Sequence, residues 1–358
     1  MNDTFAFEIE YGTCETRTSE SSGEVQFVWK RNALGRINEG IIKSVGFLYK
    51  NEQDAKDGSA EGGTAFLVSV PAEEAIAEGI EDELPLGFCH VYVVSAAHVV
   101  RQGFTTLRIN HVYGKSEIFV LPKAVQPCAE PDAWNMPEEG NDIVVYRLPI
   151  AFPNRRYNTI RLDSFATRAS RPDQPHFDEA ITENFKVAVG DELFMPGRLL
   201  DLKNANPPAV VRFGRLATLP TIEIGNITVY GNQESYMAEL RSDSGYSGAP
   251  VLVCETPITP SAEGGSVTIR ELTWLLGVNW GHLPHSDSVV AGDEKCGPLT
   301  AKTTSGIATI VSAWRLFQLL HHPELVAHRK IVWTTFKANL NSGTQGVPDF
   351  AEGQRRIL

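Results

Sequence analysis

Short runs rich in Val, Ile, Phe and Tyr recur along this chain of 358 residues, and turn-forming residues separate them. Runs of this length and spacing are typical of β-strands. They include IIKSVGFLY, GTAFLVSV, FCHVYVVSAAHVV, TLRIN, EIFVL, NDIVVYRL, AVVRFGRLATL, NITVYG, GAPVLVC and TIRELTWLLGVNWG. Because they do not alternate with helical patterns, they favour an all-β barrel or sandwich over a parallel sheet.

One amphipathic helical pattern follows these runs, in TIVSAWRLFQLLHH near the C-terminus. Its apolar residues recur three or four positions apart, which places them on one face of a helix. They are Ile310, Ala313, Trp314, Phe317 and Leu320. We therefore expect a mainly β protein with a C-terminal α-helix.

Two acidic segments, residues 51–63 and 71–87, interrupt the strand pattern. Their composition is typical of surface insertions, which most often only add solubility. They are also candidates for docking a regulatory protein partner.

The charge balance excludes some classes of partner. The formal net charge of −12 has the wrong sign for holding phosphate backbones, so we expect no nucleic acid partner. No stretch is apolar enough for a membrane helix, and the first residues do not resemble a secretory signal. The five cysteines form no C-x-x-C pair, which fits reduced thiols, and we expect a cytoplasmic protein.

Three residues at the edges of apolar runs could form a catalytic constellation. Ser247 lies in RSDSGYSGAP, His98 ends VYVVSAAHVV, and Asp142 precedes IVVYRL. A serine hydroxyl needs a base to take its proton and a third group to hold that base. Taken singly, each residue also has a simpler interpretation, as a turn residue or a structural strand-end histidine. Asp132 and Asp243 are less suited by position to orient His98.

These segments together resemble the chymotrypsin-like (trypsin-like) serine protease family, of a bacterial intracellular type. The resemblance rests on GGTAFLV with SAAHVV, NDIVVYRL, GYSGAP with VLV, and LLGVNWG with SGIATIV, in the family's order. It spans about residues 41–320 and implies two six-stranded antiparallel β-barrels with the active site between them.

The implied organisation has five parts. They are an N-terminal extension (1–40), a first barrel with His98 and Asp142 (41–160), a connection (161–190), a second barrel and C-terminal helix with Ser247 (191–325), and a tail (326–358).

The resemblance implies a serine endopeptidase acting on polypeptides through an acyl-enzyme, without a cofactor. His98 would take the proton of Ser247, and Asp142 would orient His98. The backbone N–H groups of Gly245 and Ser247 would form the oxyanion hole.

The substrate-binding residues are also implied by the resemblance. Trp280 and Gly281 match the segment that pairs with an extended substrate, and Gly306 matches a glycine in the wall of the specificity pocket. Arg241 matches the pocket floor, where it would favour an acidic side chain; if it turns outward, a small polar pocket near Ser242 remains.

Two positions depart from the family pattern. Tyr246 replaces the aspartate that pairs with a new N-terminus in many secreted relatives, so we expect no activation by N-terminal cleavage. Asn279 stands where serine is usual, so the support of Asp142 is expected to differ.

Two alternatives stay open at this stage. One is a peptide-binding or partner-regulated module with little free activity, because a fold does not decide activity. The other is metal binding by His282 with His285, or by His321 with His322. These pairs lack nearby carboxylate or cysteine ligands, so we expect no metal site.

Overall fold

The computed structural model describes most of the chain between residues 37 and 341. The described ranges are 6–9, 12–18, 25–29, 37–59, 61–71, 89–110, 116–127, 133–137, 141–148, 157–162, 187–199, 208–219, 223–224, 233–255, 258–260, 267–269, 272–289, 299–341 and 355–357.

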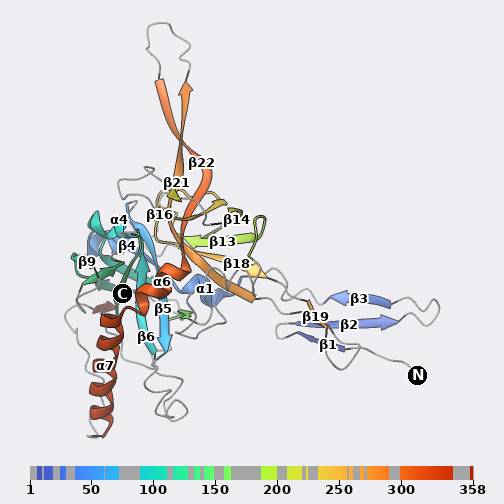
Figure 1. The fold of residues 1–358 in the computed structure, drawn as a ribbon, viewed down its shortest axis with the longest axis horizontal. Helices are drawn as coiled ribbons and strands as arrows, with labels where there is room; N and C mark the ends of the chain where they lie inside the picture. Colours follow the sequence, from blue (N-terminus) through green and yellow to red (C-terminus); the bar gives the residue numbers. More distant parts are fainter. Residues whose placement is uncertain are drawn as a thin grey trace.

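The first half of the chain forms one large sheet, with the strand order β23-β8-β7-β4-β5-β6-β11-β10-β9, while β12 pairs with β5 (Figure 1). Its strands are β4 (Val45–Tyr49), β5 (Gly63–Pro71), β6 (Cys89–Ser95), β7 (Thr106–Asn110), β8 (Ser116–Val120), β9 (Val125–Pro127), β10 (Trp134–Met136), β11 (Val144–Arg147), β12 (Ile160–Arg161) and the C-terminal β23 (Arg355–Ile357). Short helices α1 (Glu39–Lys43), α2 (Glu52–Asp57) and α4 (Ala97–Arg101) flank it.

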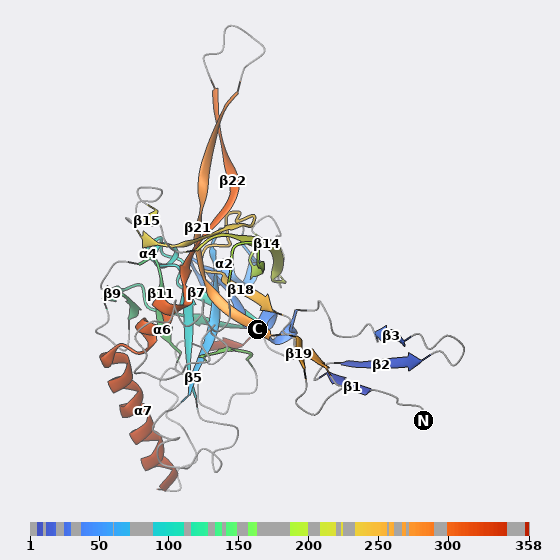
Figure 2. The same cartoon turned by 45° about the vertical axis from the view of Figure 1, so that its right-hand side comes forward.

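The second half forms a closed barrel of six antiparallel strands in the order β13-β14-β17-β22-β21-β18. They are β13 (Glu192–Gly197), β14 (Val210–Thr218), β17 (Tyr236–Glu239), β18 (Pro250–Glu255), β21 (Leu272–Val289) and β22 (Leu299–Ser312). The far ends of β21 and β22 pair only with each other in the described part of the chain, and they extend well beyond the barrel (Figures 1 and 2).

Three small sheets lie outside these two bodies. One is formed by β1 (Ala6–Ile9), β2 (Gly12–Thr18) and β3 (Val25–Trp29), and it lies to one side of the barrel (Figure 2). The other two pair β15 (Glu223–Ile224) with β16 (Gln233–Glu234), and β19 (Ile258–Pro260) with β20 (Val267–Ile269).

The all-β prediction is confirmed, and so are a six-stranded barrel and a C-terminal helix, α6 (Ala313–Leu320). The first half differs from the expected six-stranded antiparallel barrel, because its described pairings follow an open path through a ten-stranded sheet and include two parallel pairs, β9 with β10 and β5 with β12. Residues 51–58 contain the helix α2, which Asn51 caps by accepting from the Asp54 N–H, and Ala55 within it is fully buried. Most of the segment 71–87 and the run NITVYG lie outside the described residues.

The helix α7 (Pro323–Asn341) occupies the first part of the segment 326–358, which the sequence assigned to a tail. Leu325, Arg329, Trp333 and Phe336 are buried on one face of this helix. Arg329 donates to the Leu320 carbonyl (2.7 Å) and to the Tyr92 hydroxyl on β6 (3.3 Å). A charged residue in the middle of the buried stripe weakens the apolar periodicity, which hides the helix from sequence analysis.

The two halves share one hydrophobic core. A single cluster contains Phe47 and Phe66 from the first half together with Phe194, Leu252 and Trp280 from the second. Since the core is continuous, the relative position of the halves is set by close packing as well as by hydrogen bonds. Within the described residues, no helix is both long and apolar enough to cross a membrane.

Arg198, just after β13, joins the halves through buried polar contacts. It is 2 % exposed, and its guanidinium donates to the Leu48 carbonyl (3.1 Å), the Glu61 carbonyl (3.0 Å) and the Ser59 carbonyl. It also lies over the Tyr49 ring, with the guanidinium carbon 4.0 Å from the ring centroid.

We predict that Arg198→Met lowers the free energy of unfolding by roughly 3 kcal/mol, because it removes three hydrogen bonds to carbonyl groups, of which the one to Leu48 is buried. Arg215→Met is the control: its side chain is 66 % exposed and pairs with an exposed Glu192 at 3.5 Å, so we expect a change below about 0.5 kcal/mol. Urea unfolding of both variants measures the difference, and equal midpoints would contradict this role of Arg198.

A second prediction concerns His90, which lies on β6 and is 3 % exposed. Burial, followed by the positive charges of Arg329 and Arg147 and by His328, holds the pKa of His90 well below its usual 6.5. In the unfolded chain, His90 therefore binds a proton near pH 6.5, whereas in the folded chain it stays neutral. The free energy of unfolding falls as the pH drops below that value.

Between pH 6.5 and 5, we expect His90 to make the wild type lose up to about 1.4 kcal/mol of stability per pH unit. His90→Gln should not show this part of the loss. Urea unfolding at pH 8, 6.5 and 5 tests this. Parallel curves for the variant and the wild type over that interval would show that His90 does not contribute.

Candidate active site

His98 and Asp142 lie at neighbouring strand ends. His98 is in the first turn of α4, directly after β6, and Asp142 precedes β11. The two strands pair with each other, with Val144 opposite Ser95, so the ends of the strands lie side by side. Ser95 and Ala96 are small, and this leaves room for another segment to approach the imidazole.

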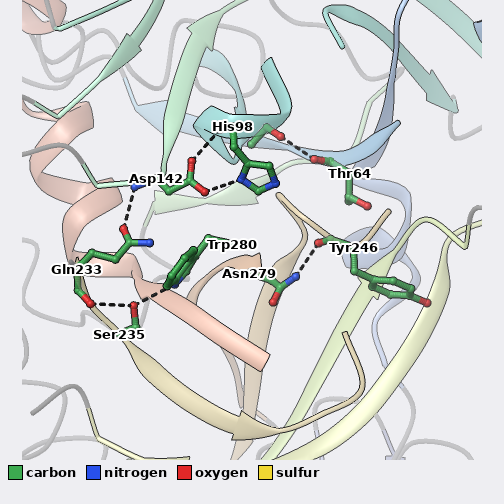
Figure 3. Close-up of polar contacts among 9 residues, drawn as sticks. Thr64, His98, Asp142, Gln233, Ser235, Tyr246, Asn279 and Trp280 are labelled. Carbon is green, nitrogen blue, oxygen red and sulfur yellow. Dashed lines mark hydrogen bonds and ion pairs between the residues drawn. The ribbon is translucent and has the colours of Figure 1, made fainter. Parts of the chain in front are cut away.

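The Asp142 carboxylate holds His98 with both of its oxygens. The His98 Nδ1 is 2.6 Å from Asp142 Oδ2, and the His98 backbone N–H donates to Oδ1 at 2.8 Å (Figure 3). Asp142 is fully buried, whereas the His98 side chain is 13 % exposed. A proton on Nδ1, facing the carboxylate, leaves Nε2 as the nitrogen that can accept one.

Ser247 lies in a tight turn between β17 and β18. Gly245 and Gly248 adopt positive φ angles of 98° and 88°, which favour glycine. Tyr246 between them is fully buried, while Ser247 is partly exposed. In the described part of the chain, neither the Gly245 N–H nor the Ser247 N–H donates a hydrogen bond. Both backbone donors of the predicted oxyanion hole are thus available.

Thr64, on β5, fastens this turn to the first half of the chain. Its backbone N–H donates to the Ser247 carbonyl (2.9 Å), and its hydroxyl donates to the Gly245 carbonyl (2.6 Å). The Ser95 hydroxyl donates in turn to the Thr64 carbonyl at 2.7 Å (Figure 3). The turn of Ser247 is therefore attached next to the strand end that leads to His98.

Gly248 shows how close this approach is. A Cβ atom at Gly248 would lie 2.1 Å from the Thr64 carbonyl oxygen and 2.3 Å from the Ser95 hydroxyl. Only glycine fits there. The structure thus joins His98 to Asp142 and places the turn of Ser247 against Ser95. No direct hydrogen bond links Ser247 to His98 among the described residues.

The prediction that Arg241 forms a pocket floor does not fit its placement. Its side chain is 68 % exposed and pairs with Asp243 at 3.0 Å, because that carboxylate lies within reach in the same loop. Arg212 also binds Asp243, at 3.0 Å. The neighbouring Ser242 is instead buried, and its hydroxyl accepts from the Asn279 amide at 2.9 Å.

Asn279 supports the turn of Ser247, and it makes no hydrogen bond to Asp142 in the described part of the chain. Its amide nitrogen also donates to the Tyr246 carbonyl at 2.9 Å, and its backbone carbonyl accepts from the Gly248 N–H at 2.7 Å. Tyr246 is anchored as well, since its hydroxyl donates to the Val210 carbonyl at 3.1 Å, and burial raises its pKa. A neutral tyrosine is therefore held by packing, by its hydrogen bond to Val210, and by Arg212, whose guanidinium carbon lies 5.6 Å from the ring centroid.

The residues after Asn279 form a strand edge. Trp280 is buried, and Gly281 pairs with Thr309 of β22. On the other side, the ladder with β18 ends at Val278, apart from the two backbone hydrogen bonds of Asn279. Within the described residues, Gly281 and His282 thus pair on one side only.

Gly306, on β22, lies next to Leu240, whose N–H donates to the Gly306 carbonyl at 2.9 Å. Its φ angle is +80°, and a Cβ there would meet no atom within 4 Å. The backbone conformation, and not space, therefore favours glycine at this position.

His282, His321 and His322 have described side chains, whereas the side chain of His285 lies outside the described ones. Among the described residues, no group of three or more His, Cys, Asp or Glu side chains could hold a metal ion. His321 instead stacks on Phe317, with ring centroids 4.0 Å apart. Among the described residues, Cys89 and Cys254 form no disulfide, and burial raises the pKa of Cys89 to about 11.

Sequence analysis missed three residues of this region: Thr64, Arg198 and Gln233. Each is a polar residue that the structure buries. Thr64 lies within GGTAFLV, and a hydroxyl inside an otherwise apolar run was the one sign that could have drawn attention to it. Gln233 follows a segment outside the described residues, and no pattern singled it out.

Comparison with known proteins gives only distant likeness. No family model and no curated protein matches this chain. The solved structures that are similar to it include the Rv3671c protease in an inactive form, and a serine-to-alanine mutant of Rv3671c from M. tuberculosis H37Rv, also in an inactive form. Each has a TM-score of 0.36 and 13 % identity over 79 % of this chain, covering 89 % and 88 % of the respective chains. A likeness of this degree assigns no family.

We predict that Thr64→Val lowers the free energy of unfolding by about 2 kcal/mol, because it leaves the Gly245 carbonyl and the Arg198 N–H without a buried partner. Thr64→Ser keeps the hydroxyl and serves as the control, with a smaller loss. Hydrogen–deuterium exchange should also rise in the peptide 241–250 of the valine variant only. Equal stability and equal exchange in the two variants would contradict the proposed role of the Thr64 hydroxyl in holding the turn of Ser247.

Proposed function

We propose that this chain is a serine endopeptidase that cleaves polypeptides through an acyl-enzyme. The observation that carries the proposal is the double contact of Asp142 with His98, at 2.6 and 2.8 Å, beside the turn that presents Ser247. A buried carboxylate that orients a partly exposed imidazole is the arrangement that a serine nucleophile requires.

The chemistry follows from these positions. His98 Nε2 takes the proton of Ser247 Oγ as the oxygen attacks the substrate carbonyl carbon. The electron pair of the carbonyl moves to its oxygen, which the Gly245 and Ser247 N–H groups stabilise. His98 then gives the proton to the leaving amine as the C–N bond breaks. Water, activated by His98, releases the acyl group in the second half of the reaction.

The free side of the strand at Gly281 and His282 supports an extended polypeptide as the substrate, because such a chain can add backbone hydrogen bonds there. The placement of Arg241 does not support a preference for acidic side chains, because its side chain is exposed and its guanidinium pairs with Asp243. We propose a small polar pocket near Ser242 instead.

Labelling with a fluorophosphonate probe tests the proposal. We expect wild-type protein to be modified at Ser247, and Ser247→Ala to be unmodified in mass spectra of the peptide. His98→Ala should label at least about a thousand-fold more slowly, because the base is lost. Ser244→Ala is the matched control, since Ser244 is an exposed serine of the same loop, and it should label like the wild type.

Absence of labelling in a folded wild-type protein would contradict a free-standing protease. If the protein then bound extended peptides without cleaving them, the peptide-binding module would be the better account. Labelling that appears only in a cell lysate would point to a partner-regulated enzyme.

A further inference from the structure

Gln233, on β16, contacts the candidate catalytic acid from the other half of the chain. Its side-chain oxygen Oε1 accepts a hydrogen bond from the Asp142 backbone N–H at 2.8 Å. Gln233 is only 6 % exposed, and Asp142 is 1 % exposed. Figure 3 shows the Gln233 amide pointing at the backbone of Asp142, on the side away from His98.

This contact matters because Asp142 lies before β11, which begins at Val144. The Asp142 N–H therefore has no partner in the sheet, and a buried N–H without an acceptor is costly. Both carboxylate oxygens of Asp142 are held by His98. Gln233 fixes the backbone to which that carboxylate is attached.

Gln233 is itself tied to the predicted substrate strand. The Trp280 indole N–H donates to the Ser235 hydroxyl at 3.0 Å, and that hydroxyl donates to the Gln233 carbonyl at 3.4 Å. All three residues are buried. A continuous chain of hydrogen bonds thus runs from Trp280 through Ser235 and Gln233 to Asp142 (Figure 3).

Asn279, which is next to Trp280 in the sequence, makes no hydrogen bond to Asp142 among the described residues. Its amide nitrogen is engaged with Ser242 and with the Tyr246 carbonyl, on the side of the nucleophile turn. The second half of the chain therefore reaches Asp142 through Gln233.

We propose that Gln233 is a positioning residue, which holds Asp142 in the orientation that aligns His98 and links this alignment to the strand of Trp280. The inference rests on the proposed function for its kinetic consequences. Its geometric part concerns only Asp142 and His98, and can be measured in a protein without activity.

The kinetic test compares Gln233→Met with Gln233→Glu. Methionine keeps the length of the side chain and removes the acceptor, so we expect kcat to fall about ten-fold while KM changes less than two-fold. Glutamate keeps an acceptor oxygen, and the Gln233 Nε2 that it replaces has no hydrogen-bond partner within the described residues. Its carboxyl would be buried beside Asp142, where the neutral form is favoured. The ratio of the kcat of Gln233→Glu to that of the wild type should therefore be closer to one at pH 6 than at pH 8.

Ser235→Ala is the matched control. It removes a buried hydroxyl from the same segment and frees Trp280, but leaves the bond between Gln233 and Asp142. We expect it to raise KM more than it lowers kcat. Unfolding midpoints of all three variants show that each is folded under the conditions of the assay.

The geometric test uses the proton shared between His98 Nδ1 and Asp142, which gives a far-downfield ¹H NMR signal when the bond is ordered. In a Ser247→Ala background this signal should broaden or disappear with Gln233→Met and persist with Ser235→Ala. An unchanged signal together with an unchanged kcat would overturn the proposal, as would equal kcat values for the Met and Glu variants at both pH values. A wild type that neither labels nor cleaves would refute the proposed function alone, and the NMR result would then decide the role of Gln233.

Discussion

The hydrogen bonds that Thr64 makes to the turn at 245–248 are the constraint on which the rest of the site depends. They join a strand of the first half to a turn that lies about 180 residues later in the chain, at 2.6 and 2.9 Å. Because the Thr64 hydroxyl and backbone both take part, the turn has little freedom to rotate. Because Gly248 has no side chain, the turn can lie against Thr64 and Ser95. The Ser95 hydroxyl in turn donates to the Thr64 carbonyl.

Buried polar residues recur wherever the two halves meet. Arg198, Thr64 and Gln233 each bind a backbone group of the opposite half, namely the Leu48 carbonyl, the Gly245 carbonyl and the Asp142 N–H. Buried polar groups contribute little net stability when paired but cost much when a partner is lost. They therefore specify one relative position of the halves, while the shared hydrophobic core supplies most of the free energy of association.

The candidate site is consequently divided between the two halves. His98 and Asp142 are brought together by the pairing of β6 with β11 inside the first sheet. The second half contributes Ser247, the candidate oxyanion donors at Gly245 and Ser247, and Gln233. Any movement of one half against the other would disturb the base and the nucleophile together, because the same contacts hold both.

Local sequence was sufficient for much of this description. Alternating apolar runs identified most strands, and small residues around Ser247 and before His98 marked the turn and the strand end. Both depend on backbone geometry within a few residues, which local composition controls. The outward orientation of Arg241, by contrast, depended on Asp243 lying within 3.0 Å, and α7 depended on the burial of Arg329.

The sequence by itself thus determined the strands, the glycine positions of the turn and the identity of the candidate triad. Only the tertiary structure decided how that triad is supported. The contacts of Thr64 with Gly245 and of Gln233 with Asp142 join residues 181 and 91 positions apart. Such pairs leave no periodicity in the chain, because each is selected by the need of one buried donor or acceptor for a partner after the halves have packed.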